Sequence, residues 1–234
     1  MVALTAVKSW FDLTDLQDEI VKMGATVVGF GDVSHGLAKE LRHLNRAVSI
    51  GIKHPVLRLA MVKKDGVEAY SNQFAEVDNL LEDIQKKVVR ILKSENWRCL
   101  SIPPDSDKVD SRYIARLYPL FPHKTAATCA GLGWIGKNGL LITRQYGARM
   151  SWATVLTNAP IPVSNSPCFS GRCGECRRCV DICPVNAISG DNWVRSETAK
   201  PFINIKACQK QLEKNWRQLG KYICGLCIMA CPRS

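Results

Sequence analysis

The stretch CGECRRCVDICP, residues 173–184, spaces four cysteines as C-x2-C-x2-C-x3-C and places Pro184 directly after the last of them. This is the spacing of the bacterial run that holds [4Fe–4S] clusters. Three thiolates two residues apart can wrap one face of a cubane cluster, whereas the fourth is directed toward a neighbouring cluster. The proline restricts φ and stops the segment from continuing as a helix. The run therefore predicts one cluster and implies a second.

A second, incomplete run, CGLCIMACP, occupies residues 224–232. Its first cysteine is missing because Lys221 stands in that place, and Cys208, sixteen residues before Cys224, is expected to replace it. If the last cysteine of each run serves the other cluster, eight ligands divide into two complete sets. The first cluster is then expected on Cys173, Cys176, Cys179 and Cys231, and the second on Cys183, Cys208, Cys224 and Cys227.

Zinc is the competing interpretation, because paired C-x2-C units also bind Zn²⁺ tetrahedrally. Zinc sites do not call for a third cysteine at the next step, nor for a proline after the last one, so clusters are favoured. Three further cysteines remain. Cys168 is a substitute ligand, a thiol on the substrate side or a free loop cysteine, and the last is favoured. Cys99 and Cys129 are expected to behave as small buried hydrophobes.

Composition limits the class of protein. The chain has 234 residues and 46% hydrophobic residues, enough for a proper core. The first residues do not resemble a secretory signal, and no run of about 18 apolar residues occurs. We therefore expect a cytoplasmic protein with no membrane partner. In that reducing compartment, dense cysteines favour metal binding over disulfides.

The formal charge of +11, from 32 basic and 21 acidic residues, is often a sign of nucleic-acid binding. Eight thiolates around two cores of charge 2+ would lower it by about 4. Several lysine and arginine residues lie next to ligand cysteines in the sequence, and their positive charge can balance the negative charge of the clusters. A basic surface also suits an acidic electron donor such as ferredoxin or flavodoxin. The net charge alone therefore neither establishes nor excludes nucleic-acid binding.

Hydrophobic periodicity predicts how the chain is organised. Helices are expected at 12–23, 73–94 and 205–219, and strands at 25–30, 47–52, 59–62, 97–102, 140–143 and 151–157. A proline-rich linker is expected at 159–167. Strands that alternate with helices favour an α+β fold, an α/β-like sandwich over residues 1–160, followed by a ferredoxin-like double-cluster module over residues 161–234.

A glycine-rich stretch, GLGWIGKN at 131–138, nearly matches the phosphate-binding pattern G-x4-G-K-[ST]. Asparagine replaces the hydroxyl residue, and the preceding AATCA favours a helix where a strand is required, so the match is weak. Two interpretations remain, a turn for tight packing and a close backbone approach to a bulky cofactor. For the second, the candidate cofactor-binding residues are Gly131, Gly133, Trp134, Gly136, Lys137 and Asn138, with Lys137 meeting an anionic group.

Together, AGLGWIGKNGLLIT (130–143), ATVLTNAPIP (153–162) and the two cysteine runs resemble the epoxyqueuosine reductase family, including its short double-cluster relatives. Looser matches upstream are VVGFGDV and RAVSIGI. The resemblance implies a first domain like that of corrinoid-dependent reductive dehalogenases and nitroreductases. It also implies a cobalamin against that domain, fed with electrons by two clusters on the eight cysteines above.

The sequence departs from that family in two ways. The tRNA-modifying enzymes continue past the clusters into a helical-repeat region, whereas this sequence ends at Ser234. They also carry an aspartate general acid before the glycine-rich stretch, where this sequence reads LYPLFPHKTAAT (117–128). His123 is a candidate catalytic proton donor there, or simply a residue that starts a helix.

Three functions are compared. The favoured one is an iron–sulfur oxidoreductase that relays electrons through two clusters to a cofactor or a small-molecule substrate of unknown identity in residues 1–160. The alternative is an electron-transfer protein that serves a partner enzyme. A carrier needs only about 60 residues to hold two clusters, whereas this chain has a further domain over residues 1–160 that a carrier does not require. A tRNA-acting enzyme completed by a partner chain is disfavoured.

Overall fold

The computed structural model describes residues 12–56, 67–102, 104, 121–196 and 201–234. Its centre is a four-stranded antiparallel sheet in the order β1-β2-β6-β3. The strands are β1 (Val27–Asp32), β2 (Arg46–Lys53), β6 (Met150–Thr157) and β3 (Cys99–Ile102). All four were predicted from the sequence. The strand expected at 59–62 lies outside the described residues.

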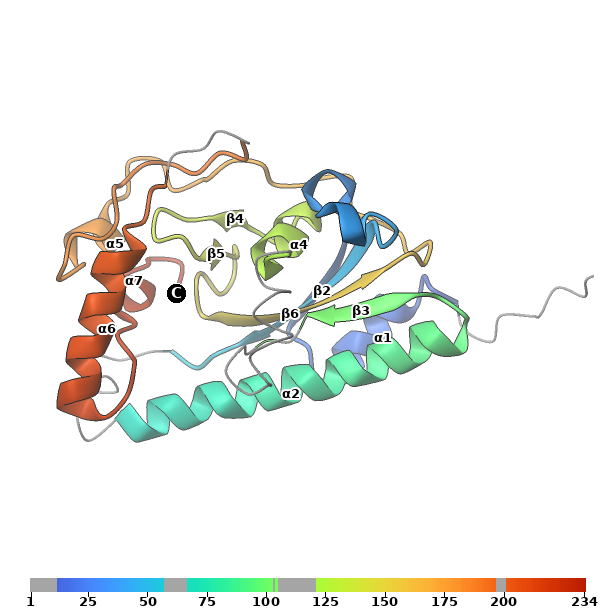
Figure 1. Cartoon of the computed structure of the whole chain (residues 1–234), viewed down its shortest axis with the longest axis horizontal. Coiled ribbons are helices and arrows are strands. Elements are labelled where there is room, and N and C mark those ends of the chain that lie inside the picture. Colours follow the sequence, from blue (N-terminus) through green and yellow to red (C-terminus); the bar gives the residue numbers. More distant parts are fainter. Residues whose placement is uncertain (1–11, 57–66, 103, 105–120, 197–200) are drawn as a thin grey trace, which may run out of the picture.

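One face of the sheet is covered by α1 (Leu16–Lys22) and the long α2 (Val67–Ser94), as Figure 1 shows. Alternate residues of β2 point to this face because side chains alternate across a strand. Val48 and Ile50 pack there against an apolar stripe of α2 that includes Ile84. The stripe confirms the predicted helix at 73–94, which begins six residues earlier than expected.

The opposite face carries small residues in β1 and β2 and receives α4 (His123–Cys129), which confirms a helix before the glycine-rich stretch. The sequence of β1, VVGFGD, directs Val28 and Phe30 to the first face and leaves glycines on this one. A Cβ at Gly31 would lie 2.7 Å from the backbone nitrogen of Ala130. Glycine therefore lets the end of α4 lie directly on the sheet.

Two short strands follow α4, namely β4 (Trp134–Ile135) and β5 (Leu141–Ile142). They pair with each other in a separate two-stranded sheet, and the glycine-rich stretch forms β4 and the loop that connects them. A turn closed between Thr143 and Gly147 then leads into β6. Two short 3-10 helices, Ser34–Gly36 and Lys39–Leu41, connect β1 to β2.

The cysteine-rich segment forms α5 (Arg178–Asp181), α6 (Ile205–Leu219) and α7 (Leu226–Met229) at one end of the molecule (Figure 1). The bounds of α6 agree with the sequence prediction. Its start is capped by Asn204, whose side chain accepts a 3.0 Å bond from the N–H of Ala207. In the described part of the chain, no helix has the length and apolar character needed to cross a membrane.

Candidate two-cluster centre and adjoining cavity

Four cysteines that are far apart in the sequence line one small cavity of about 160 Å³. Three come from the loop and helix of the first run, and the fourth comes from the end of the second run. The four are Cys173, Cys176, Cys179 and Cys231, the set expected for the first cluster. The glycine-rich stretch supplies the facing wall of this cavity through Trp134, Lys137 and Asn138.

The pKa shifts of Cys179 and Cys208 are caused in part by other cysteines of the same expected ligand set. Burial raises the pKa of Cys179, and the nearby Cys173, Cys176 and Cys231 raise it further. Burial likewise raises the pKa of Cys208, with Cys224 and Cys183 adding to the effect. A thiolate is therefore disfavoured at each of these positions until iron is bound, and cluster binding must release protons.

Cys227 is the most strongly affected thiol. Burial, followed by the negative charge of Cys224, raises the pKa of Cys227 to about 12. Its other neighbours include Cys208 and Cys183 of the second set and Cys179 of the first. The two sets thus adjoin each other near Cys179 and Cys227, as two clusters with interlaced ligands require.

The spacing of the thiols bears on the metal. Within the described residues, no three cysteine, histidine or acidic side chains gather closely enough to hold a single metal ion. Four of the cysteines line the 160 Å³ cavity, and in a cluster each of these thiolates would bind a different iron. The sulfur of Cys183 also accepts a 3.3 Å hydrogen bond from the N–H of Ala187, the kind of contact that stabilises a ligating thiolate.

The three remaining cysteines are placed as follows. Cys168 is buried in an apolar group with Trp134, and Cys173 and Cys231 pack against the same group. Cys129 is buried, as expected, whereas Cys99 is only half-buried. Burial raises the pKa of both Cys129 and Cys99.

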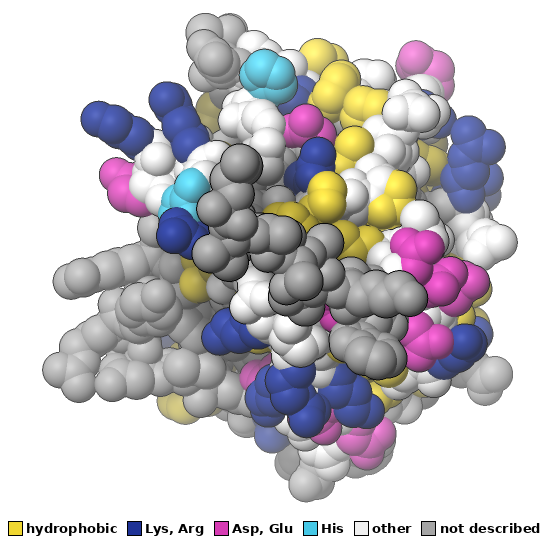
Figure 2. All heavy atoms as spheres, turned by 90° about the vertical axis from the view of Figure 1, so that its right-hand side faces the viewer, with side chains coloured by type: hydrophobic (Ala, Val, Ile, Leu, Met, Phe, Trp, Pro, Cys, Tyr) yellow, Lys and Arg dark blue, Asp and Glu magenta, His cyan; other side chains and the backbone are white. Residues whose placement is uncertain are grey.

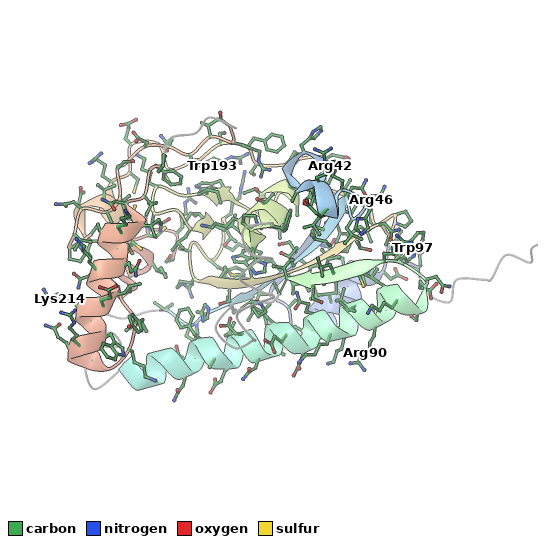
Figure 3. The ribbon with its side chains drawn as sticks, viewed as in Figure 1. Arg42, Arg46, Arg90, Trp97, Trp193 and Lys214 are labelled. Atoms are coloured by element: carbon green, nitrogen blue, oxygen red, sulfur yellow. The ribbon has the colours of Figure 1, made fainter. Side chains whose placement is uncertain are left out.

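A larger cavity of about 730 Å³ lies between α4, the glycine-rich loop and the cysteine-rich segment. Cys208 and Cys227 of the second set form part of its wall. Aromatic and polar side chains line the rest, including Trp193 and Phe202; Figure 3 shows Trp193 on the loop above β4 and α4. Asn138 lines both cavities and stands between them.

Two cations belong to the larger cavity. The ammonium group of Lys124 donates a 2.7 Å bond to the carbonyl oxygen of Gly139, and desolvation lowers the pKa of Lys124. Arg195 donates a 2.5 Å bond from Nη2 to Oγ1 of Thr128 and lies 5.1 Å from the ring centre of Phe169. Its Nε is buried and has no acceptor among the described residues. No sequence motif marks either cation.

The glycines of the glycine-rich stretch contact the chain itself. A Cβ at Gly133 would collide with the carbonyl oxygen of Ile142, and one at Gly136 would lie 2.7 Å from Cγ1 of the same residue. Gly131 has φ +71°, which favours glycine. The stretch therefore packs on β5 through its glycines and presents Lys137 and Asn138 to the cavities. Binding of a cofactor by these residues stays a prediction.

His123 is the first residue of α4, and its side chain is directed to the sheet. Its Nδ1 lies 2.9 Å from Oγ1 of Thr154 in β6. His123 is not one of the residues that line the cavities described above, whereas the next residue, Lys124, is. A catalytic role for His123 stays a prediction.

Residues 172–234 match the family of 4Fe-4S double cluster binding domains. The epoxyqueuosine reductase of Vibrio cholerae is 27% identical over 191 residues, which are 80% of this chain and 49% of that protein. The epoxyqueuosine reductase of Lactococcus garvieae is 35% identical over 109 residues, 45% of this chain and 30% of that protein. The chain thus spans at most about half the length of these relatives.

Solved structures show the same fold. A crystal structure of epoxyqueuosine reductase with a tRNA-Tyr stem loop aligns over 95% of this chain and 66% of its own, with a TM-score of 0.58 and 19% identity. A reductive dehalogenase whose structure suggests a mechanism for B12-dependent dehalogenation aligns over 98% of this chain and 33% of its own, with a TM-score of 0.65 and 17% identity. The expected resemblance, the α+β fold and the two [4Fe–4S] clusters are therefore confirmed.

Proposed function

We propose that this epoxyqueuosine reductase-like iron–sulfur oxidoreductase passes electrons through its two clusters to a group bound in the larger cavity. One observation supports the proposal above all: Cys208 and Cys227, expected ligands of the second cluster, form part of the wall of that cavity. The first set of cysteines lies behind them, around the smaller cavity. In this proposal residues 1–160 supply one side of the cofactor and substrate cavity, and residues 161–234 supply electrons and the other side of that cavity, which includes Arg195.

A corrinoid is the proposed occupant, because the fold is shared with a B12-dependent dehalogenase. The cavity offers such a group both apolar and polar side chains. Its volume is about 730 Å³, Trp193 and Phe202 give it apolar walls, and the Nε of Arg195 has no acceptor in the part of the chain that the structure describes. Asn138, Lys124 and Arg195 would hold the edges of the group. When bound, a corrinoid would supply a strongly reducing cobalt centre.

Lys124 is the proposed proton-holding residue of the cavity. Desolvation lowers the pKa of Lys124, which makes its ammonium group a better proton donor. A reductive step that adds electrons to a substrate also needs protons. His123 would have to leave Thr154 before it could serve instead. The substrate is proposed to be a small molecule; a tRNA stem loop, which a solved relative binds, is the disfavoured alternative.

An acidic redox protein is the proposed electron donor. Residues 172–234 contain eleven Lys and Arg against five Asp and Glu. Lys206, Lys210 and Lys214 follow one another at i, i+4 spacing along α6 and are exposed. Figure 3 shows Lys214 on the outer side of α6. By contrast, the opposite end of the molecule mixes acidic and basic side chains (Figure 2).

Titration with cob(II)alamin tests the proposal. Anaerobically reconstituted protein should change the visible absorption and electron paramagnetic resonance (EPR) spectra of the corrinoid, and Arg195→Met should weaken the change at least tenfold in apparent Kd. Arg90→Met, an exposed arginine on α2 (Figure 3), is the matched control and should bind normally. Unchanged corrinoid spectra with both clusters intact would contradict the proposal and favour an electron carrier without substrate chemistry.

A further inference from the structure

Trp134 occupies an unusual position for a tryptophan. It lies in β4, is only 5% exposed, and packs in an apolar group with Ile142 and Ala148. Cys173 and Cys231, two expected ligands of the first cluster, pack against the same group. Trp134 also lines the 160 Å³ cavity around which the four cysteines of the first set are arranged. Its ring is therefore next to the site of the first cluster.

The indole N–H of Trp134 is buried and has no hydrogen-bond acceptor among the described residues. A buried donor without a partner costs about 1–3 kcal/mol, and buried tryptophans usually place this group against an acceptor. The cavity that Trp134 lines is bordered by the four cysteines of the first set and by the polar side chains of Lys137, Asn138, Arg172 and Arg233. The lysine and arginine side chains can only donate, and Oδ1 of Asn138 already accepts a bond from the N–H of Leu140. The cysteine sulfurs are therefore the favoured side-chain acceptors at this cavity.

Lys137 adds a positive charge to the same wall. It is 5% exposed and lines the 160 Å³ cavity three residues after Trp134. A cluster held by four thiolates carries net negative charge, which becomes larger on reduction. A buried cation and an N–H donor beside it both stabilise the reduced state more than the oxidised one.

We infer that Trp134 is a tuning residue of the first cluster: its indole N–H donates a hydrogen bond to a cluster or cysteinyl sulfur and, together with Lys137, raises the reduction potential of that cluster. This rests on the assignment of the first ligand set and does not depend on the corrinoid. The bond would also hold the glycine-rich stretch against the cysteine-rich segment.

Trp134→Phe tests the inference, because phenylalanine keeps an aromatic ring and removes the N–H. The midpoint potential of the first cluster should fall, with the reduced-to-oxidised ratio at a fixed potential decreasing about fivefold. The EPR signal is assigned to the first cluster by its loss in Cys176→Ser. Trp152→Phe is the matched control, since Trp152 is also buried but packs near Leu141 and Met150 away from this cavity.

A second readout keeps the test decisive if Trp134→Phe fails to retain the cluster. In wild-type protein labelled with 15N in the indole ring, pulsed EPR of the reduced state should detect a coupling to one tryptophan nitrogen. The coupling should persist in Lys137→Gln, whose potential should nevertheless fall. Absence of any 15N coupling in the wild type would overturn the inference, as would an unchanged potential in Trp134→Phe with both clusters intact.

Discussion

The side-chain amide of Asn138 donates a 3.4 Å hydrogen bond to the carbonyl oxygen of Cys227, across 89 positions of the sequence. The oxygen of the same amide accepts a 3.2 Å bond from the N–H of Leu140. Asn138 also lines both cavities. The glycine-rich loop is thereby tied to the second cysteine run at the place where cluster and cavity meet.

Replacement of Asn138 by alanine should loosen that connection. We expect a loss of about 1 kcal/mol in the free energy of unfolding, because two long hydrogen bonds are removed, one to the carbonyl oxygen of Cys227 and one from the N–H of Leu140. Iron should also be released faster in the presence of a chelator. Urea denaturation and chelator kinetics measure both effects. Gln218→Ala, an exposed change on α6, serves as control and should alter neither.

Gly31→Ala tests the contact between α4 and the sheet. The added Cβ would approach the backbone of Cys129 and Ala130 to within 2.8 Å, so the helix must shift. We expect destabilisation by about 1–3 kcal/mol, as for other overpacked cores. Gly36→Ala should cost less, because its nearest neighbour is a side-chain methyl group of Thr125 at 3.0 Å. Equal stability of the two variants in thermal unfolding would contradict this packing.

The sheet and its helices could be predicted because their patterns are local. The alternation in β2 and the stripe in α2 follow from apolar side chains that must face one core. The division of the cysteines into two ligand sets was inferred from the sequence for a different reason, since one cluster cannot be completed without a ligand from the other run. The ligand sets stay a prediction, which the cavity lined by the first four cysteines supports.

The larger cavity could not be predicted, because it depends on residues that no motif connects. Lys124 and Arg195 line the same cavity because α4 packs against a loop some seventy residues later in the sequence, where Arg195 bonds to Thr128 of α4. His123 drew attention as a titratable residue, yet the direction of its side chain is decided by Thr154 in a distant strand. The proposed role of Trp134 was likewise invisible in the sequence, because only the fold reveals that no described residue accepts a hydrogen bond from its N–H.

His54 should make stability depend on pH. Burial, and secondarily the charge of Arg149, lowers the pKa of His54 to about 4, against 6.5 for the ordinary side chain. Between these values the unfolded chain binds more protons than the folded one, so stability falls as pH falls from about 6.5 toward 4. The loss should reach about 1 kcal/mol between pH 7.5 and 5.5.

The measurement is urea unfolding at pH 7.5 and 5.5 for the wild type and His54→Gln. The variant lacks the titrating group. On acidification its free energy of unfolding should therefore fall by about 1 kcal/mol less than that of the wild type, even if its stability at pH 7.5 is already reduced. The same pH slope in both proteins would show that His54 is not the group responsible.

The exposed lysines of α6 should control the rate of electron supply. Charge reversal in the double variant Lys210→Glu and Lys214→Glu should slow reduction of the clusters by reduced flavodoxin or ferredoxin at least tenfold at low salt. The difference should shrink at high ionic strength because salt screens exposed charges. Lys86→Glu on α2 is the control, and stopped-flow absorbance measures the rates. Equal rates for the double variant and the control would exclude α6 as the docking surface.

The claim that the two clusters are ligated crosswise can be tested by the EPR spectrum of reduced Cys231→Ser, compared with those of Cys176→Ser and Cys224→Ser, with iron counted in each variant. If ligation is crossed, Cys231→Ser and Cys176→Ser lose the same cluster signal, although their cysteines belong to different runs, and Cys224→Ser loses the other signal. If Cys231→Ser instead loses the signal that Cys224→Ser loses, each run holds its own metal and the claim is contradicted.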